Sequence, residues 1–316
     1  MRALRAEVLP LPVAAAVACV VLLLRKRKLP FAVSDSSRSI AALRALESEK
    51  DEDDALFNDP FAAKLAGEAA LARVCARGAK GDNGRIAIRT KFFDDAVVHA
   101  LGDGTEQVVL LGAGLDTRAW RLAPPKGSEK AAAVFEVDVP EVLNGKETVL
   151  RDAPLTLSNK YCAVKSNLNR KGWHASLLKA GFDKQKKTIW VTEGLLYYLA
   201  PNVVRDVLVG TYELSPMGSR LVSSVVNHAS YKRASKPGSK GAKATWKSWS
   251  NMPERDFLRY GWRVQTIMQP GESGANYGRW RGEVPPPRAI PSKAQGEELE
   301  ETPRTFYVVC TRLDER

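Results

Sequence analysis

Residues that bind structural metals or form disulfide frameworks are scarce in this sequence. The cysteines form no CxxC pair, and the histidines stand far apart with no regular spacing. These residues are Cys19, Cys75, Cys162, Cys310, His99, His174 and His228. Their scatter argues against a structural zinc site and against a disulfide-stapled secreted fold. We therefore expect a reducing compartment for the folded part and no metal ion.

Acidic residues are nearly absent from the two most basic stretches of the chain. The 316 residues carry a net charge of +12. Residues 1–30 contain Glu7 as their one acid, and residues 232–247 contain none. Positive charge concentrated in a terminal flank and one loop is typical of membrane topology and of a solvated loop, rather than of a surface that binds nucleic acid. We expect no nucleic-acid partner.

Charged residues are also missing from residues 8–24, an apolar run interrupted only by Pro10 and Pro12. Its length is near the lower limit for crossing a bilayer. Four basic residues follow at 25–28, where a signal peptide would have small residues before its cleavage site. This pattern favours a retained membrane anchor, with the folded domain facing the cytosol. A signal or organelle-targeting peptide, and a short helix packed on a soluble cytoplasmic domain, remain open.

The rest of the composition suits one large α/β domain with a helical addition. Hydrophobic residues make up 44% and charged residues 27% of the chain, which is enough to bury a full core. Residues 229–250, rich in Lys, Ser and Gly, predict either a flexible loop over the site or plain surface disorder. The expected parts are an anchor or targeting segment (1–30), a polar linker (31–50), a helical N-terminal cap (51–104) and a ligand-binding core (105–316).

The chain is organised around residues 105–122, TEQVVLLGAGLDTRAWRL. A run of Val and Leu predicts a strand, and the polar run after the Gly-Ala-Gly elbow can open a helix. Gly112 and Gly114 have no Cβ, so the backbone can turn sharply and approach a ligand closely. A third glycine is lacking, and Asp116 would repel a phosphate. S-adenosylmethionine, which has no phosphate, therefore fits better than NAD, although an NAD-dependent oxidoreductase remains a rival.

Acidic residues end two apolar runs. The strand expected at 131–138 leads to Asp138, whose carboxylate could accept hydrogen bonds from both ribose hydroxyls of a nucleoside. The alternative is an N-cap for a helix that begins near Pro140. The run 188–199, TIWVTEGLLYYL, contains Glu193 at the end of a buried strand. Because an uncompensated buried acid is costly, Glu193 is expected either to be paired or to face a cavity.

Four separated motifs resemble the leucine carboxyl methyltransferase superfamily, most closely its bacterial-type branch of S-adenosylmethionine-dependent methyltransferases. They are IRTKFFDD, LLGAGLDTRAWRL, FEVDVPEVL followed by a lysine, and WVTEGLLYYL. The resemblance covers about residues 50–316. It implies a class I methyltransferase (Rossmann-like) α/β fold, with a seven-stranded, mostly parallel sheet, helices on both faces and a helical N-terminal cap. It also implies S-adenosylmethionine as the cofactor.

The resemblance implies roles for individual residues at the methionine and ribose ends of the cofactor. Arg89 would grip the methionine carboxylate, a task that suits the fixed guanidinium fork. The elbow glycines Gly112 and Gly114 would lie beneath the cofactor, Asp138 would bind the ribose, and Glu193 would close the methionine end. Arg89 could instead be a structural ion-pair partner of Asp94 or Asp116.

At the adenine end the sequence departs from the family pattern. The family has an Asp-Leu pair after the third strand, and here that pair is Asn167-Leu168. The amide oxygen of Asn167 can accept a hydrogen bond from the adenine amino group, but without the charge of a carboxylate. A plain turn residue is the alternative for Asn167.

The chemistry of the cofactor narrows the methyl acceptor. A carboxylate is ionised at neutral pH and needs no base, whereas an alcohol or phenol does need one. The matched motifs contain no histidine, which leaves Glu193 and Tyr197 as open candidates for a base. We expect an O-methyltransferase acting on a carboxylate or hydroxyl of a small molecule. A protein C-terminal leucine carboxylate is an alternative acceptor, and a membrane-tethered, non-catalytic cofactor-binding protein is an alternative function.

Overall fold

The computed structural model describes residues 34–77, 82, 84–125, 132–158, 160–236, 245–284, 286–288 and 301–313. The anchor expected at residues 8–24 lies outside these ranges. Among the helices that are described, none combines the length and the apolar character needed to cross a membrane.

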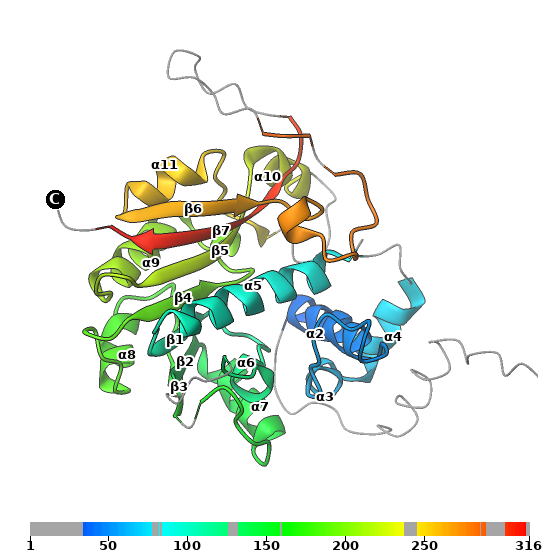
Figure 1. Cartoon of the computed structure of the whole chain (residues 1–316), viewed down its shortest axis with the longest axis horizontal. Coiled ribbons are helices and arrows are strands. Elements are labelled where there is room, and N and C mark those ends of the chain that lie inside the picture. Colours follow the sequence, from blue (N-terminus) through cyan, green and yellow to red (C-terminus); the bar gives the residue numbers. More distant parts are fainter. Residues whose placement is uncertain are drawn as a thin grey trace, which may run out of the picture.

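A mixed sheet of seven strands forms the centre of the molecule, in the order β3-β2-β1-β4-β5-β7-β6 (Figure 1). Strand β7 runs antiparallel to both of its neighbours, β5 and β6, and the other neighbouring strands pair in parallel. The strands are β1 (Gln107–Leu111), β2 (Ala133–Asp138), β3 (Tyr161–Lys165), β4 (Thr188–Thr192), β5 (Arg220–Val226), β6 (Trp262–Met268) and β7 (Thr305–Arg312). The expected α/β fold with a seven-stranded, mostly parallel sheet is confirmed.

The order of the strands creates a ligand site next to β1. From β1 the chain builds outward through β2 and β3, then returns to place β4 on the other side of β1. In open α/β sheets, the crevice at the carboxyl ends of the strands where the order reverses is where ligands bind. The Gly-Ala-Gly elbow follows β1 and Glu193 follows β4, so the topology brings both to this crevice.

Helices cover both faces of the sheet. Successive side chains of β1 point to opposite faces, and each face packs into its own hydrophobic cluster. Val108 and Leu110 pack with α5 (Arg85–Gly102), while Val109 and Leu111 pack with residues of α8 (Trp173–Lys179) and α9 (Pro201–Glu213). The remaining helices of the core are α6 (Arg118–Arg121), α7 (Pro140–Leu150), α10 (His228–Ala234) and α11 (Pro253–Leu258).

The polar linker expected at 31–50 is wrong for most of its length. Residues Asp35–Ser48 form helix α2, and the side chain of Ser34 caps its first turn by accepting a hydrogen bond from the backbone N–H of Ser37. Ala41, Ala42 and Ala45 are buried in the core. Serine at the start of a helix is a capping signal, and small alanines let the helix pack closely. The serines and alanines of this segment therefore belong to a packed helix and not to a tether.

The N-terminal cap therefore starts earlier than expected. It comprises α2, α3 (Ala62–Ala66) and α4 (Glu68–Arg77), which gather beyond α5 on one side of the sheet in Figure 1. The chain breaks between α3 and α4 at Gly67, whose φ is 75°. The loop expected at 229–250 is also partly wrong, because its first residues belong to α10, which Asn227 caps.

Candidate functional site

A pocket lies at the carboxyl ends of β1 and β4, at the crevice that the strand order predicts. Its wall consists of residues 110–116 of the elbow, Val191, Glu193 and Gly194 at the end of β4, and Arg89 from α5. Ser37, Ile40 and Arg44 of α2 complete it. The sequence-based expectations missed the contribution of α2, because they assigned that segment to a linker.

The elbow glycines adopt backbone conformations that other residues rarely do. Gly112 has a φ of 63° and Gly114 a φ of 51°. A Cβ placed on Gly112 would come within 2.6 Å of the Leu195 side chain, whereas around Gly114 the nearest atoms would be 3.9 Å away. Gly112 therefore allows close packing against Leu195, in the segment after β4, whereas a Cβ on Gly114 would make only ordinary van der Waals contacts.

Asp138 holds the elbow from the neighbouring strand. Its Oδ2 accepts a hydrogen bond of 2.7 Å from the backbone N–H of Gly114, and its Oδ1 accepts one of 2.7 Å from the N–H of Val139. The alternative of a helix N-cap is wrong, because Val139 occupies that position in α7 and no side chain caps it. Asp138 stands beside the pocket rather than on its wall, so its ribose contact stays a prediction.

Glu193 is both paired and on the pocket wall. Arg89 donates from Nε to its Oε1 at 2.8 Å, and Arg118 donates from Nη2 to its Oε2 at 2.7 Å. Burial alone would raise the pKa of Glu193, but the charges of Arg118 and Arg89 outweigh burial, and the pKa is lowered. The alternative partners of Arg89 are wrong: Asp94 and Asp116 pair with Arg118 instead.

A second wall residue, Asp116, is held as an anion. Burial would raise its pKa, but Arg118, Arg121 and Lys146 lower it to about 2. Arg118 contacts its carboxylate through both the backbone N–H and Nη1. Asp116 is therefore an ionised carboxylate on the pocket wall whose charge is balanced by Arg118.

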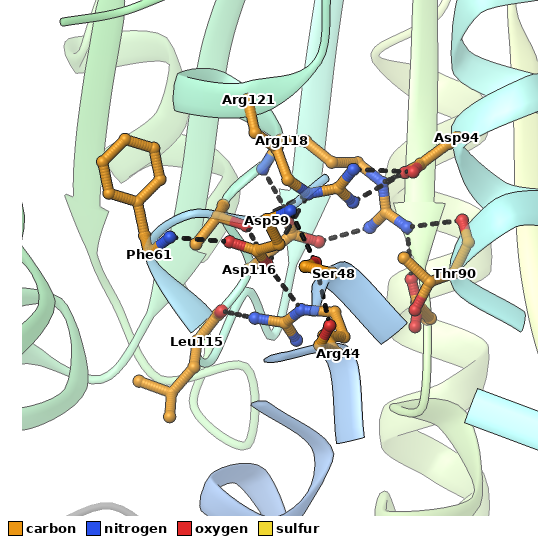
Figure 2. A network of polar contacts seen from close by, with 12 residues as sticks. Arg44, Ser48, Asp59, Phe61, Thr90, Asp94, Leu115, Asp116, Arg118 and Arg121 are labelled. Atoms are coloured by element: carbon orange, nitrogen blue, oxygen red, sulfur yellow. Dashed lines mark hydrogen bonds and ion pairs between the residues drawn. The ribbon is translucent and has the colours of Figure 1, made fainter. Parts of the chain in front are cut away.

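Buried ion pairs connect the site to the helical cap (Figure 2). Arg44 of α2 donates from Nε to Asp59 at 2.8 Å and from Nη2 to the carbonyl oxygen of Leu115 in the elbow at 2.6 Å. Asp59 also accepts a hydrogen bond from Thr117 at 2.7 Å. On the other side, Asp94 of α5 receives hydrogen bonds from Arg118 and Arg121.

Sequence reasoning missed these network residues. The one available signal was the concentration of charge in DTRAWR, directly after a buried strand. Charged side chains in such a place need partners. The partners lie far away in sequence, so the fold alone identifies them.

Asn167 and Leu168 follow β3, which β2 separates from the elbow strand. The Asn167 side chain accepts a hydrogen bond of 2.9 Å from the backbone N–H of Asn169, as a turn residue does. Leu168 is buried in the hydrophobic cluster on the α8 and α9 face. Neither residue is on the pocket wall, so their contact with adenine stays a prediction. Within the part of the chain that the structure covers, no group of three His, Cys, Asp or Glu residues could hold a metal ion.

A family model described as leucine carboxyl methyltransferase matches residues 38–211. A Streptomyces coelicolor protein named "Putative S-adenosyl-L-methionine-dependent methyltransferase" is 38% identical over 201 residues, which are 61% of this chain and 69% of that protein. A Frankia alni protein of the same description is 33% identical over 266 residues, which are 79% of this chain and 89% of that protein.

Two solved structures share the fold at low sequence identity. A DUF574 family protein from Streptomyces avermitilis has a TM-score of 0.53 and 14% identity, over 86% of this chain and 96% of its own. A protein from Thermobifida fusca, titled a "putative methyltransferase", has a TM-score of 0.53 and 17% identity, over 90% of this chain and 97% of its own. At these identities the similarity supports the architecture alone.

Proposed function

As a member of the leucine carboxyl methyltransferase family, this chain is an S-adenosylmethionine-dependent methyltransferase, and we propose that its methyl acceptor is an oxygen nucleophile of a small molecule, namely a carboxylate. The observation that carries the proposal is that each carboxylate on the pocket wall is bound by arginine, so neither can act as a general base.

The residues of the pocket suit the cofactor. Arg89 uses Nε to bind Glu193, and its Nη1 lies beside Gly194 on the wall, which leaves guanidinium donors for the methionine carboxylate. Glu193 offers a negative charge to the amino group of that methionine and to the sulfonium. Asp138, which holds the backbone of Gly114 beside the pocket, suits the ribose.

Neither candidate base, Glu193 or Tyr197, has a protonation state at neutral pH that suits a general base. Glu193 has a lowered pKa and shares its oxygens between two arginines, so it stays ionised and is a weak proton acceptor at neutral pH. Burial raises the pKa of Tyr197, and the nearby Arg89 only partly offsets this, so the Tyr197 hydroxyl stays protonated at neutral pH. An acceptor that is already ionised avoids the need for either group.

S-adenosylmethionine supplies a methyl group that its sulfonium makes electrophilic. An ionised carboxylate would accept this methyl group without release of a proton, so no residue of the chain would need to act as a base. The chain's own residues hold the reactants in line and keep water away. Ile40 of α2, on the pocket wall, serves the second purpose.

Two alternative functions make different experimental predictions from this proposal. A protein with a C-terminal leucine carboxylate has the same reacting group but needs a surface for a peptide. A non-catalytic cofactor-binding protein would bind S-adenosylmethionine without turnover.

Calorimetric titration of the full chain with S-adenosylmethionine tests the cofactor, with NAD as the competing ligand. We expect micromolar binding of S-adenosylmethionine alone, with loss of binding in Asp138→Ala and no change in the exposed control Asp206→Ala. Release of S-adenosylhomocysteine with carboxylate acceptors then tests the reaction. Turnover of alcohols with no turnover of carboxylates would contradict the proposed acceptor class.

A further inference from the structure

Three aromatic side chains stand together beyond the end of β4, outside the wall of the cofactor pocket. The Tyr197 ring centroid lies 4.8 Å from that of Tyr198 and 4.9 Å from that of Trp246. Tyr198 and Trp246 are half-buried. We call these three residues the aromatic wall. Their position follows the strand that carries Glu193, at the same edge of the sheet as the pocket.

The aromatic wall is attached to the main body through the backbone. The N–H of Lys247 donates to the carbonyl oxygen of Tyr197 at 2.7 Å, and the hydroxyl of Ser248 donates to the carbonyl oxygen of Leu196 at 2.7 Å. These bonds fix the segment that carries Trp246 against the short helix Leu196–Tyr198. The wall is therefore a preformed surface, which lowers the entropic cost of binding a rigid ligand.

Tyr197 connects the wall to the cofactor pocket. A Cβ built on Gly194 would lie 3.4 Å from the Tyr197 hydroxyl and 3.4 Å from Nη1 of Arg89. Gly194 is itself on the pocket wall. The hydroxyl of Tyr197 therefore marks the border between the methionine end of the pocket and the aromatic wall. This border is where an acceptor must place its nucleophile.

A second arginine stands at the same border. Arg85 precedes Arg89 by one helical turn of α5, so both side chains project from the same face. Burial raises the pKa of both Tyr197 and Tyr307, and the charge of Arg85 partly opposes this rise. Its side chain is 35% exposed, and its ion pair with Asp82 is long, with Nε 4.0 Å from Oδ1. Arg85 thus keeps charge available for an anion that enters from solvent.

We propose that the methyl acceptor is an aromatic carboxylate, with its ring against Trp246 and Tyr198 and its carboxylate between Arg85 and the Tyr197 hydroxyl. This inference rests on the proposed function and specifies the substrate class of the same site. A planar ring gains stacking energy on the wall that an aliphatic chain of equal size does not. A charged oxygen gains the guanidinium interaction that an uncharged amide does not.

The test compares three probes of similar shape on the full chain saturated with S-adenosylhomocysteine. They are 2-naphthoate, its fully saturated decahydro analogue, and 2-naphthamide. Dissociation constants come from saturation-transfer NMR with competition. We expect 2-naphthoate to bind at least about tenfold more tightly than either analogue, a ratio that one good stacking or charged contact provides.

Two variants assign the preference to residues. Arg85→Gln should remove the preference for 2-naphthoate over 2-naphthamide but keep that for the aromatic ring. Trp246→Leu should remove the preference for the aromatic ring over the saturated analogue but keep that for 2-naphthoate over 2-naphthamide. In both variants the affinity for S-adenosylhomocysteine should stay within about twofold of the wild-type value, because neither residue is on the cofactor pocket wall, and this also reports correct folding.

Three outcomes would overturn the inference. Equal affinity for the three probes, in a protein that binds S-adenosylhomocysteine, would reject the aromatic acceptor and leave the proposed function standing. A peptide ending in leucine that binds more tightly than 2-naphthoate would point to a protein acceptor. If the protein bound no S-adenosylhomocysteine, the proposed function would fail, and the acceptor site with it.

Discussion

Arg118 and Glu193 are 75 residues apart in the sequence, yet Nη2 of the arginine lies 2.7 Å from Oε2 of the glutamate. Arg118 belongs to the first turn after the β1 elbow, and Glu193 directly follows β4. This pair ties the two neighbouring strand ends together across the pocket. The side chain of Arg118 is only 1% exposed, so the interaction acts in a medium that screens charge poorly.

Loss of Arg118 should destabilise the protein strongly. Arg118→Gln removes one positive partner from each of three largely buried carboxylates, on Asp94, Asp116 and Glu193. Breaking a buried ion pair costs about 3–5 kcal/mol, whereas an exposed pair contributes about 0–1 kcal/mol. Urea unfolding should show this contrast between Arg118→Gln and the exposed control Arg205→Gln, whose partner is Asp206. Equal midpoints for the two variants would contradict a structural role for the buried network.

Substitution of the second elbow glycine should weaken cofactor binding more than folding. Gly114→Ala forces a Cβ into a left-handed backbone conformation, which costs about 1–2 kcal/mol, and places a methyl group over the pocket. We expect the dissociation constant for S-adenosylmethionine to rise at least about tenfold, or 1.4 kcal/mol. Gly102→Ala is the matched control, since a Cβ there meets no atom within 4 Å and its φ is not positive. A similar affinity in both variants would argue that the cofactor does not lie over the elbow.

The rate with a carboxylate acceptor should be independent of pH between about 6 and 9, because an ionised acceptor needs no base. The pKa of Glu193 lies below its ordinary value and that of Tyr197 above its own, so neither group changes charge in this window. Burial raises the pKa of Glu136 to about 7, against the opposing charge of Lys146, so the profile is measured in Glu136→Gln as well. A step in kcat near neutral pH in both proteins would reveal a general base.

At acid pH the same network should lose stability. The pKa of Glu193 lies below its ordinary value of 4.5. The pKa of Asp116 is lowered from 3.8 to about 2. A carboxylate with a lowered folded-state pKa stabilises the fold above its unfolded value, and this contribution is lost as pH falls through the folded value. The free energy of unfolding should therefore decrease from about pH 4.5 downward, with a smaller decrease in Glu193→Gln. If the free energy of unfolding fell equally with pH in the wild type and the variant, Glu193 would not contribute to the loss of stability in acid.

Restoring the family acid at position 167 tests the adenine end. If Asn167 faces the adenine amino group, Asn167→Asp should tighten S-adenosylmethionine binding by about 1 kcal/mol, because a charge-assisted hydrogen bond is stronger than a neutral one. The turn should survive, since an aspartate oxygen can also accept from the N–H of Asn169. Asn169→Asp is the control for added charge, and calorimetry is the measurement. A gain of equal size in the control would mean a long-range charge effect instead of a contact.

Much of the core was predictable because its signals are local. The apolar run before Gly112 predicts β1, Pro201 opens α9, and the acid after each buried run marks the ligand edge of the sheet. The prediction for segment 31–50 was wrong for a local reason as well. A serine that caps a helix, such as Ser34, cannot be distinguished by composition from a serine in a tether. The alanines of α2 gave too weak a hydrophobic pattern to separate the two.

The sequence by itself determined the glycine elbow, the strands before it and before Glu193, and the identity of the acids at their ends, since each depends on residues close together in the chain. Only the tertiary structure decided which charges meet. Arg89 could have paired with Asp94 or Asp116 by its place in the sequence, but it contacts Glu193, because the strand order sets β4 beside β1. Arg44 reaches the elbow for the same kind of reason, as buried charges take the partners that the packed helices bring near them.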